Sequence, residues 1–301
     1  MTGMPVEYGV VQVIDPLATE PLVRRIVAPN PGPFTLTGTN TFILGQGRVA
    51  VIDPGPASPD HVEALLAGLR GETVEAILVT HTHLDHSPAA ALLRARTGAP
   101  THGFGPHGAG RPVADCDAGL DDAGADRDFV PDVTVADGAV IEGEGWSVRA
   151  VHTPGHAANH LCFALAGRGW LFSGDHVMGW SSTVVSPPDG DMAAYMASLD
   201  RLLGRLVDRA DTRYLPAHGP AIDDPQARVR ALIDHRRARR QAILDGLARG
   251  DRTIEALVAA IYTGLAPALR PAAGRNVLSH LLELRAAGLV SPGLGTTWRL
   301  S

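Results

Sequence analysis

The feature that most constrains this chain is a cluster of polar residues placed directly after an apolar run. In ILVTHTHLDHSPAAALL, residues 77–93, the apolar run predicts a buried strand. Ser87 and Pro88 predict the start of a helix, with Ser87 as N-cap and Pro88 at the first helical position. The cluster therefore occupies a strand-to-helix turn at a sheet edge, where α/β proteins tend to build sites. Its members are His81, His83, Asp85 and His86.

The side chains in this turn suit a metal. Neutral imidazole nitrogens and carboxylate oxygens bind zinc and related ions where no thiolate is available. The chain has two cysteines, Cys116 and Cys162, which is too few for a disulfide framework or a cysteine-rich zinc motif. A metal must accordingly be held by histidine and carboxylate groups.

Short apolar runs alternate with helical patterns over most of the chain, which predicts an α/β body over residues 1–224. Helices are expected at 61–70, 88–97 and 192–207. The segment 102–132 lacks periodicity and is rich in Gly, Pro and Asp, which predicts a long surface loop. A chain of 301 residues with 45% apolar residues can bury the core of one large domain and a small second one.

The pattern becomes helical throughout in residues 225–301. Helices are expected at 226–249, from the N-cap Thr253 onward, and at about 272–287, followed by a two-stranded ribbon. This order is the outline of a small winged-helix-like domain. A helical cap that only packs on the body explains the pattern as well.

The sign of the net charge also changes between residues 1–224 and residues 225–301. Residues 225–301 contain 12 Arg and five acidic residues, a net charge of +7, so residues 1–224 carry −13 of the overall −6. A basic tail can attract polyanions, although a solvated helix face explains it too.

Further polar residues follow apolar runs elsewhere in the chain. His156 lies in TPGHAANH, Asp175 in FSGDHV, His218 in LPAHGP and Asp53 in VIDPG. Each alone is typical of a hydrogen-bonded turn residue. With the cluster at 81–86, they could supply two metals, with one carboxylate bridging.

These motifs resemble those of the metallo-β-lactamase superfamily, whose H-x-H-x-D-H motif is matched in full. The resemblance implies an αββα sandwich with a dinuclear site at one edge. It places His81, His83 and His156 on one metal and Asp85, His86 and His218 on the other, with Asp175 bridging. Asp53 matches a carboxylate that orients a ligating histidine.

A closer resemblance covers nearly the whole chain, through segments such as NPGPFTLTGTNTFILG, SGDHVMG and HRRARRQAILDGL. These look like the lactamase-like protein 2 group, which includes an endoribonuclease acting on single-stranded RNA. They are also similar to metal-dependent thioesterases that release acyl chains from carrier proteins. The expected activity is therefore hydrolysis of an ester-type bond by a metal-bound hydroxide, with Asp85 orienting the nucleophile.

The resemblance makes cleavage of single-stranded RNA the leading interpretation of substrate. A thioesterase or acyl ester hydrolase of the glyoxalase-II or acyl-carrier type is the alternative. The acidic body and the aspartates of the 102–132 loop oppose a polyanion, and aromatic residues for base stacking are few. A nucleic-acid-binding regulator and a β-lactam hydrolase are minor alternatives.

Other residues carry weaker expectations. Asn40 either contacts substrate or caps a turn, and His160 is expected to orient the ligand loop. The segment 176–192, with Met178, Trp180 and Val184, is either a substrate wall or ordinary packing. His176 is at most an orienting residue. The remaining histidines are interpreted as surface or structural residues: His61, His102, His107, His152, His235 and His280.

The cofactor expectation is two divalent ions, zinc first, with manganese or iron as alternatives. Partners are expected to be a small ester or thioester or single-stranded RNA. No export signal or long apolar span is evident, which predicts a cytoplasmic protein without membrane contact. The oligomeric state is left open.

Overall fold

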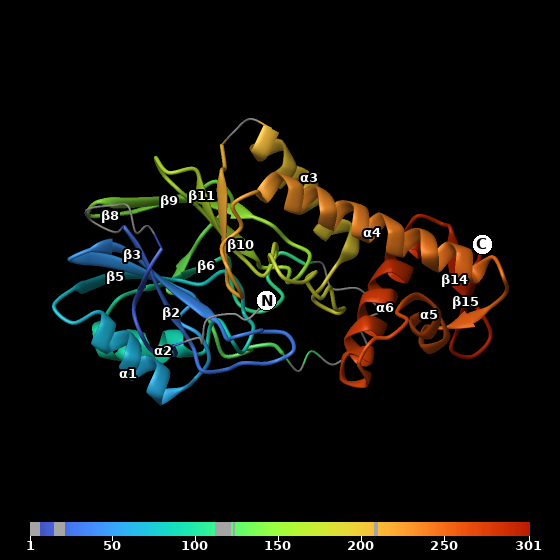
Figure 1. The fold of residues 1–301 in the computed structure, drawn as a ribbon, viewed down its shortest axis with the longest axis horizontal. Coiled ribbons are helices and arrows are strands. Elements are labelled where there is room, and N and C mark those ends of the chain that lie inside the picture. The colour runs from blue at the N-terminus through green and yellow to red at the C-terminus, as the bar shows by residue number, and fades with distance from the viewer. Residues whose placement is uncertain (1–6, 15–21, 112–121, 123, 208–209) are drawn as a thin grey trace.

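The computed structural model describes residues 7–14, 22–111, 122, 124–207 and 210–301. Within these residues, two β-sheets pack face to face, helices cover the outer face of each, and a helical domain follows at the C-terminal end (Figure 1). The predicted αββα sandwich with a small C-terminal domain is confirmed.

The first sheet of the described chain has seven strands in sequence order, antiparallel from β1 to β4 and parallel from β4 to β7. Its strands are β1 (Gln12–Val13), β2 (Val23–Val27), β3 (Asn40–Gln46), β4 (Arg48–Ile52), β5 (Thr73–Leu78), β6 (Thr101–Gly103) and β7 (Val133–Thr134).

The second sheet has the order β12-β11-β10-β9-β8 in the described residues, and only the β11–β12 pair is parallel. Its strands are β8 (Val140–Gly143), β9 (Trp146–His152), β10 (Leu161–Leu165), β11 (Trp170–Gly174) and β12 (Arg213–Pro216).

Side chains that alternate along each strand supply the apolar residues of two layers of the sandwich. Phe42 and Leu44 of β3 face the second sheet, where they join a core with Phe163 and Phe172, and Ile43 faces the helices on the other side. Because successive side chains of a strand point to opposite faces, one apolar strand serves two layers of the sandwich.

Helices cover each outer face. The first sheet is covered by α1 (Pro59–Gly68) and α2 (Ala89–Thr97), whose Leu65 and Leu93 are fully buried. The second is covered by α3 (Met192–Val207) and by the first half of α4 (Pro225–Leu247). The predicted span of α3 is confirmed, and the other helices begin within two residues of their expected positions.

The C-terminal domain is built on the second half of α4. Ile243 and Leu247 of this helix pack with Leu257, Leu281 and other apolar residues in a separate core. Its other elements are β13 (Arg252–Thr253), α5 (Ile254–Ile261), a 3₁₀ turn (Pro267–Leu269), α6 (Arg270–Ala286), β14 (Val290–Pro292) and β15 (Thr297–Leu300).

Thr253 caps α5 as predicted, since its hydroxyl accepts a hydrogen bond from the amide of Ala256. The expected ribbon at the C-terminus is present, and β13 adds a third strand to it. Because α4 contributes to both cores, the two domains share one continuous helix. Nowhere in the described chain is a helix long and apolar enough to cross a membrane.

Candidate metal centre

The turn between β5 and α2 presents the clustered polar residues at the sheet edge. Its backbone is closed by hydrogen bonds from the amides of His86 (2.9 Å) and Ser87 (3.2 Å) to the carbonyl of His83. The expected N-cap is wrong, because α2 is capped at Pro88 without a side-chain hydrogen bond. The Ser87 hydroxyl instead donates to Asp126 Oδ2 at 2.6 Å. Ser87 therefore ties the turn to the loop that follows β6.

Three histidines form the first group of candidate ligands. His81, His83 and His156 each offer a ring nitrogen, and these nitrogens lie within 4.8 Å of one another. His81 Nε2 and His83 Nδ1 are 2.9 Å apart. The ring of His156 is oriented by the Val184 carbonyl, which lies 2.7 Å from His156 Nδ1 and leaves Nε2 directed at the group.

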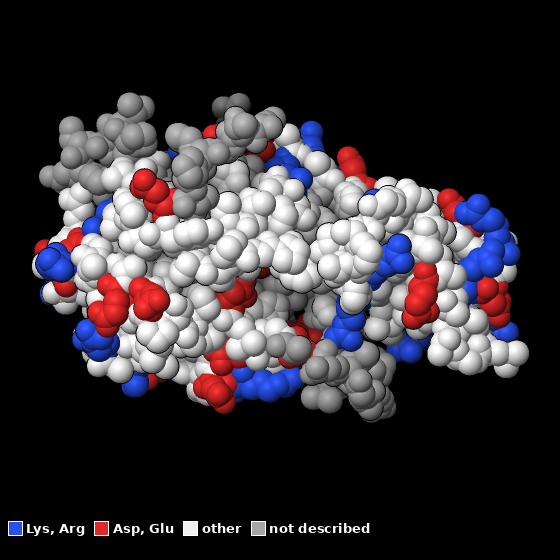
Figure 2. Space-filling view, turned by 60° about the horizontal axis from the view of Figure 1, so that its bottom comes forward, with Lys and Arg blue, Asp and Glu red and all other residues white. Residues whose placement is uncertain are grey.

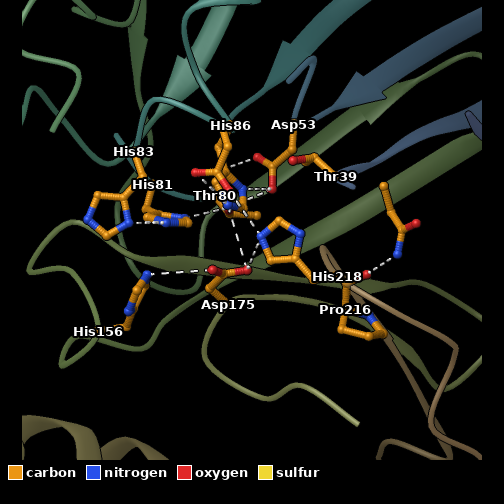
Figure 3. A network of polar contacts seen from close by, with 12 residues as sticks. Thr39, Asp53, Thr80, His81, His83, His86, His156, Asp175, Pro216 and His218 are labelled. Carbon is orange, nitrogen blue, oxygen red and sulfur yellow. Dashed lines mark hydrogen bonds and ion pairs between the residues drawn. The ribbon is translucent and has the colours of Figure 1, made fainter. Parts of the chain in front are cut away.

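Asp85, His86 and His218 form the second group, again with ligand atoms within 4.8 Å. Asp175 lies between the two groups. Its Oδ1 is 3.3 Å from His218 Nε2 and 3.6 Å from His86 Nε2, and its Oδ2 is 3.7 Å from His156 Nε2. Figure 3 shows these side chains converging from separate strands and loops on one space. All seven predicted ligands are thus brought together.

The unpaired atoms at this site fit a metal. Each of the atoms in question is buried, and none has a hydrogen-bond partner within the described chain: His86 Nε2, His156 Nε2, His218 Nε2 and Asp175 Oδ1. Buried polar atoms without partners cost free energy, so native proteins normally pair them. Divalent cations would satisfy these atoms together, and the donor set of imidazole and carboxylate suits zinc, manganese or iron.

The charges within the centre also favour a cation. Burial alone would lower the pKa of His86, but the charges of Asp85, Asp175 and Asp53 outweigh burial and raise it well above its usual value. For His218, burial is likewise outweighed by Asp175 and Asp85, and the pKa rises to about 10. Carboxylates that attract protons this strongly also attract divalent metal ions.

The first group differs in its electrostatics. Burial, followed by the nearby charge of His156, lowers the pKa of His83 to about 3. Burial and neighbouring histidines hold the pKa of His81 well below its usual value. These histidines are therefore neutral at pH 7 and ready to bind a metal through a nitrogen lone pair.

The three predicted supporting residues each hold part of the centre. Asp53 accepts hydrogen bonds from the amide and the hydroxyl of Thr80, both at 2.7 Å, and its Oδ2 lies 3.0 Å from His86 Nδ1. Asn40 is buried, and its amide group donates to the carbonyls of Pro216 and Gly219 at 2.9 Å each, on either side of His218. Both amide hydrogens of Asn40 are thus used on the loop that carries His218.

His160 supports Asp175. Its Nε2 accepts a hydrogen bond from the Asp175 amide at 3.2 Å, and its Nδ1 lies 2.9 Å from the hydroxyl of Thr153. Both ring nitrogens are thus occupied, as expected for a residue that orients the ligand loop. His176 is buried nearby, with no hydrogen-bond partner for either ring nitrogen in the described residues.

The C-terminal domain reaches the centre through the segment that orients His156. The amide of Val185 donates to Asn276 Oδ1 at 3.0 Å, and Arg236 Nη1 donates to the same oxygen at 3.2 Å. Arg236 Nη2 also donates to the carbonyl of Thr183. Two residues from α4 and α6 therefore fix the backbone on both sides of Val184, whose carbonyl contacts His156. This connection could not be predicted from the sequence, because the two side chains contact backbone groups of a distant segment.

Comparisons with known proteins agree with this geometry. Residues 34–218 match the family described as the metallo-beta-lactamase superfamily, and residues 253–298 match the beta-lactamase associated winged helix domain. The chain is 33% identical over 255 residues to an atrochrysone carboxyl ACP thioesterase of Aspergillus chevalieri, covering 80% of this chain and 73% of the relative. It is 32% identical over 284 residues to a beta-lactamase-like protein 2 homolog of Drosophila melanogaster, covering 88% of each.

Among solved structures, a beta-lactamase domain protein from Burkholderia ambifaria is similar over 100% of this chain and 96% of its own, with a TM-score of 0.79 and 22% identity. At this identity the likeness shows the fold alone. The resemblance predicted from the motifs, including its winged-helix part, is confirmed.

Proposed function

This chain belongs to the metallo-beta-lactamase superfamily of hydrolases, and from that membership we propose that it is a dinuclear metal-dependent hydrolase of acyl thioesters. The observation that carries the proposal is a set of exposed or half-buried apolar side chains that neighbour the candidate ligands in the chain or in space. We call this set the apolar rim, and its members are Leu36, Leu84 and Trp180.

The rim borders the second group of ligands. Leu84 lies between His83 and Asp85 in the chain, and 49% of its surface is exposed. Leu36 is 39% exposed, and its side chain and that of half-buried Trp180 both lie against Gly219, next to His218. Exposed apolar side chains grouped at a site favour an apolar ligand, because covering them removes their surface from water. An acyl chain is such a ligand.

Charge near the centre disfavours a polyanion. Asp122 and Asp126 lie on the described part of the loop that contacts the ligand turn, where the amide of Asp126 donates to the carbonyl of Thr82. Three further aspartates of the 102–132 loop, Asp115, Asp117 and Asp121, lie outside the described residues. Figure 2 shows acidic side chains beside the hollow in the middle of the molecule, with some basic ones next to them, and a further group of basic side chains at the far end of the C-terminal domain.

Arginines of the basic tail are also occupied within the protein. Arg228 donates to the carbonyl of Met178 at 2.6 Å, and Arg240 pairs with Glu283 at 3.1 Å. Others with internal contacts are Arg236, Arg239 and Arg275. These groups are less available to phosphates than the net charge of +7 suggests. RNA cleavage, favoured by that charge and by the winged-helix domain, is therefore the second candidate.

Two metal ions held by the seven ligands would make a water molecule acidic enough to attack at neutral pH and would polarise the thioester carbonyl. Asp85 is suited to hold that water, because 28% of its side chain is exposed, against 11% for Asp175. Burial alone would raise the pKa of Asp85, but His86 and His218 lower it, so Asp85 is ionised and can accept the proton of a hydrogen bond. In the overall reaction a C–O bond forms from water, the C–S bond breaks, and an acid and a thiol are released.

The chemistry of the leaving group supports a thioester as the substrate. A thiol has an ordinary pKa near 8.5 and departs readily as a thiolate, so the site needs no strong general acid. The relative named as an ACP thioesterase supports the same class of bond.

A substrate panel tests the proposal. Metal-loaded protein should release thiol from acyl-pantetheine thioesters and leave single-stranded RNA intact, and Asp85→Asn should lower thioester kcat by at least roughly a hundredfold without unfolding the protein. Cleavage of RNA with thioesters untouched would contradict the proposal. So would full thioesterase activity in Asp85→Asn.

A further inference from the structure

A second cluster of metal-binding groups lies outside the centre described above. One ring nitrogen of His107 and one carboxylate oxygen each of Asp122 and Asp189 lie within 4.8 Å of one another. The three residues come from separate segments: the turn after β6, the loop before β7 and the turn before α3. The sequence interpretation of His107 as a surface or structural residue did not foresee this grouping.

The ring of His107 is held so that one nitrogen faces the cluster. Its Nδ1 lies 3.2 Å from the hydroxyl of Thr82, which also accepts a hydrogen bond from Asn159 Nδ2 at 2.9 Å. When Nδ1 carries the proton and donates it to Thr82, Nε2 keeps a free lone pair. A hydrogen bond of this kind on the outer nitrogen is typical of metal-binding histidines.

Asp189 has one carboxylate oxygen in use and one without a partner. Only 3% of Asp189 is exposed, and its Oδ2 accepts a hydrogen bond from the amide of Ala158 at 3.1 Å. Its Oδ1 is buried and has no hydrogen-bond partner in the part of the chain that the structure describes. A buried, unpaired carboxylate oxygen is costly unless a cation or donor faces it.

The contact between His107 and Asp122 has the same character as the contacts in the main centre. His107 Nε2 lies 3.2 Å from Asp122 Oδ2, yet this oxygen has no hydrogen-bond partner in the described residues. The same holds for His218 Nε2, which lies 3.1 Å from Asp85 and is also unpaired. In both places the atoms are close without the geometry of a hydrogen bond, as expected for atoms that share one cation.

We propose that His107, Asp122 and Asp189 bind a further divalent cation, separate from the two of the main centre. One imidazole nitrogen and two carboxylate oxygens are ligands for zinc or manganese, with water completing the coordination. The charge of a divalent ion would match that of the two carboxylates. The cation would join the turns of residues 105–111 and 186–190 to Thr82 and Ala158, neighbours of the main ligands.

Counting bound ions tests this site. After dialysis against zinc and removal of free ions, mass spectrometry should find one ion per chain fewer in His107→Ala and in Asp189→Asn than in the unaltered protein. Asp128→Asn, an exposed aspartate of the same loop, is the matched control and should lose none. His107→Gln replaces His107→Ala if the latter does not fold, as judged by thermal unfolding.

The expected difference of one ion does not depend on how many ions the main centre retains. His83→Ala, which removes a ligand of the main centre, should still lose one further ion when combined with Asp189→Asn. Equal ion counts in the unaltered protein and both variants of the cluster would show that His107 and the aspartates form an ion pair network without a metal, and would overturn the proposal.

Discussion

Asp53 shows how a single residue can organise a metal centre from outside it. Its backbone has a φ of 49°, a conformation that non-glycine residues rarely adopt. Such strain persists where surrounding contacts hold it, and here the carboxylate contacts both Thr80 and His86. The residue thereby fixes both the start of the ligand turn and the ring of His86.

We expect Asp53→Asn to weaken metal binding by roughly 10- to 100-fold, the range for partners of ligating histidines. Asparagine has a single oxygen and cannot accept all three hydrogen bonds, so either the turn or His86 loses its support. Competition with a chelating dye measures the affinity, and Asp200→Asn, on the exposed face of α3, is the control. Unchanged affinity in Asp53→Asn would show that Asp53 has no positioning role.

His280 is a residue whose effect is on stability. It is 2% exposed on α6, where it lines a cavity with Met192 of α3 and Arg236 of α4. Burial, followed by the charges of Arg236 and Arg240, lowers its pKa to about 3. The unfolded chain takes up this proton near pH 6.5 and the folded protein does not. Its stabilising contribution is therefore complete above pH 6.5 and is lost as the pH falls toward 3.

Between pH 7 and pH 4.5, this single group should reduce the free energy of unfolding by roughly 2 to 3 kcal/mol. His280→Gln removes the titration, so its unfolding free energy should fall less over the same range. Urea unfolding of both proteins in the presence of a chelator gives the difference. Parallel pH profiles for the two proteins would show that His280 is not buried in the neutral form.

The sequence predicted which candidate ligands would lie together better than it predicted the contacts that support them, for a physical reason. Ligand chemistry requires particular side chains, and each of His156, Asp175 and His218 follows an apolar run that ends at the same edge of the sandwich. Asn40 acts through carbonyls 176 and 179 residues away. Every residue has a backbone carbonyl, so the contact between the Val184 carbonyl and His156 could not be predicted from residue types.

At the scale of elements, the segment between β11 and α3 connects the two domains to the centre. From its sequence, this segment is interpreted as either a substrate wall or ordinary packing. In the structure it contributes Trp180 to the apolar rim and the Val184 carbonyl to His156, and it is held by Arg275, whose Nε donates to the Ser186 hydroxyl at 2.8 Å. The winged-helix domain thus contacts the segment that orients His156, a candidate metal ligand.

Asn276→Ala should therefore weaken binding at the first group of ligands by roughly tenfold, the lower end of the effect of outer partners. The substitution removes the acceptor for the Val185 amide and for Arg236, which frees the backbone beside Val184. Zinc competition measures the affinity, and Arg285→Ala, exposed on the same helix, is the control. A loss of thermal stability with unchanged zinc affinity would confine Asn276 to a structural role.

At the scale of the whole molecule, the net charge of the tail does not show which charged and apolar side chains are available to a substrate. The sequence gives the tail a charge of +7, but it cannot show that Arg228, Arg236 and Arg240 are turned inward, because their partners lie on distant segments. Nor can it show that Leu36 and Trp180 meet beside His218. The choice of substrate depends on this arrangement, which only the fold defines.

The preference for acyl chain length tests the central claim most directly. The measurement is kcat/KM for octanoyl- and acetyl-pantetheine thioesters with metal-loaded protein. The apolar rim predicts at least roughly tenfold higher kcat/KM for the octanoyl thioester, since each buried methylene contributes about 0.8 kcal/mol. Leu84→Ser should reduce that ratio severalfold and leave acetyl hydrolysis nearly unchanged, whereas Leu92→Ser, equally apolar and exposed on α2, should have no effect. Equal kcat/KM for both thioesters, or a ratio that Leu84→Ser does not alter, would contradict the account.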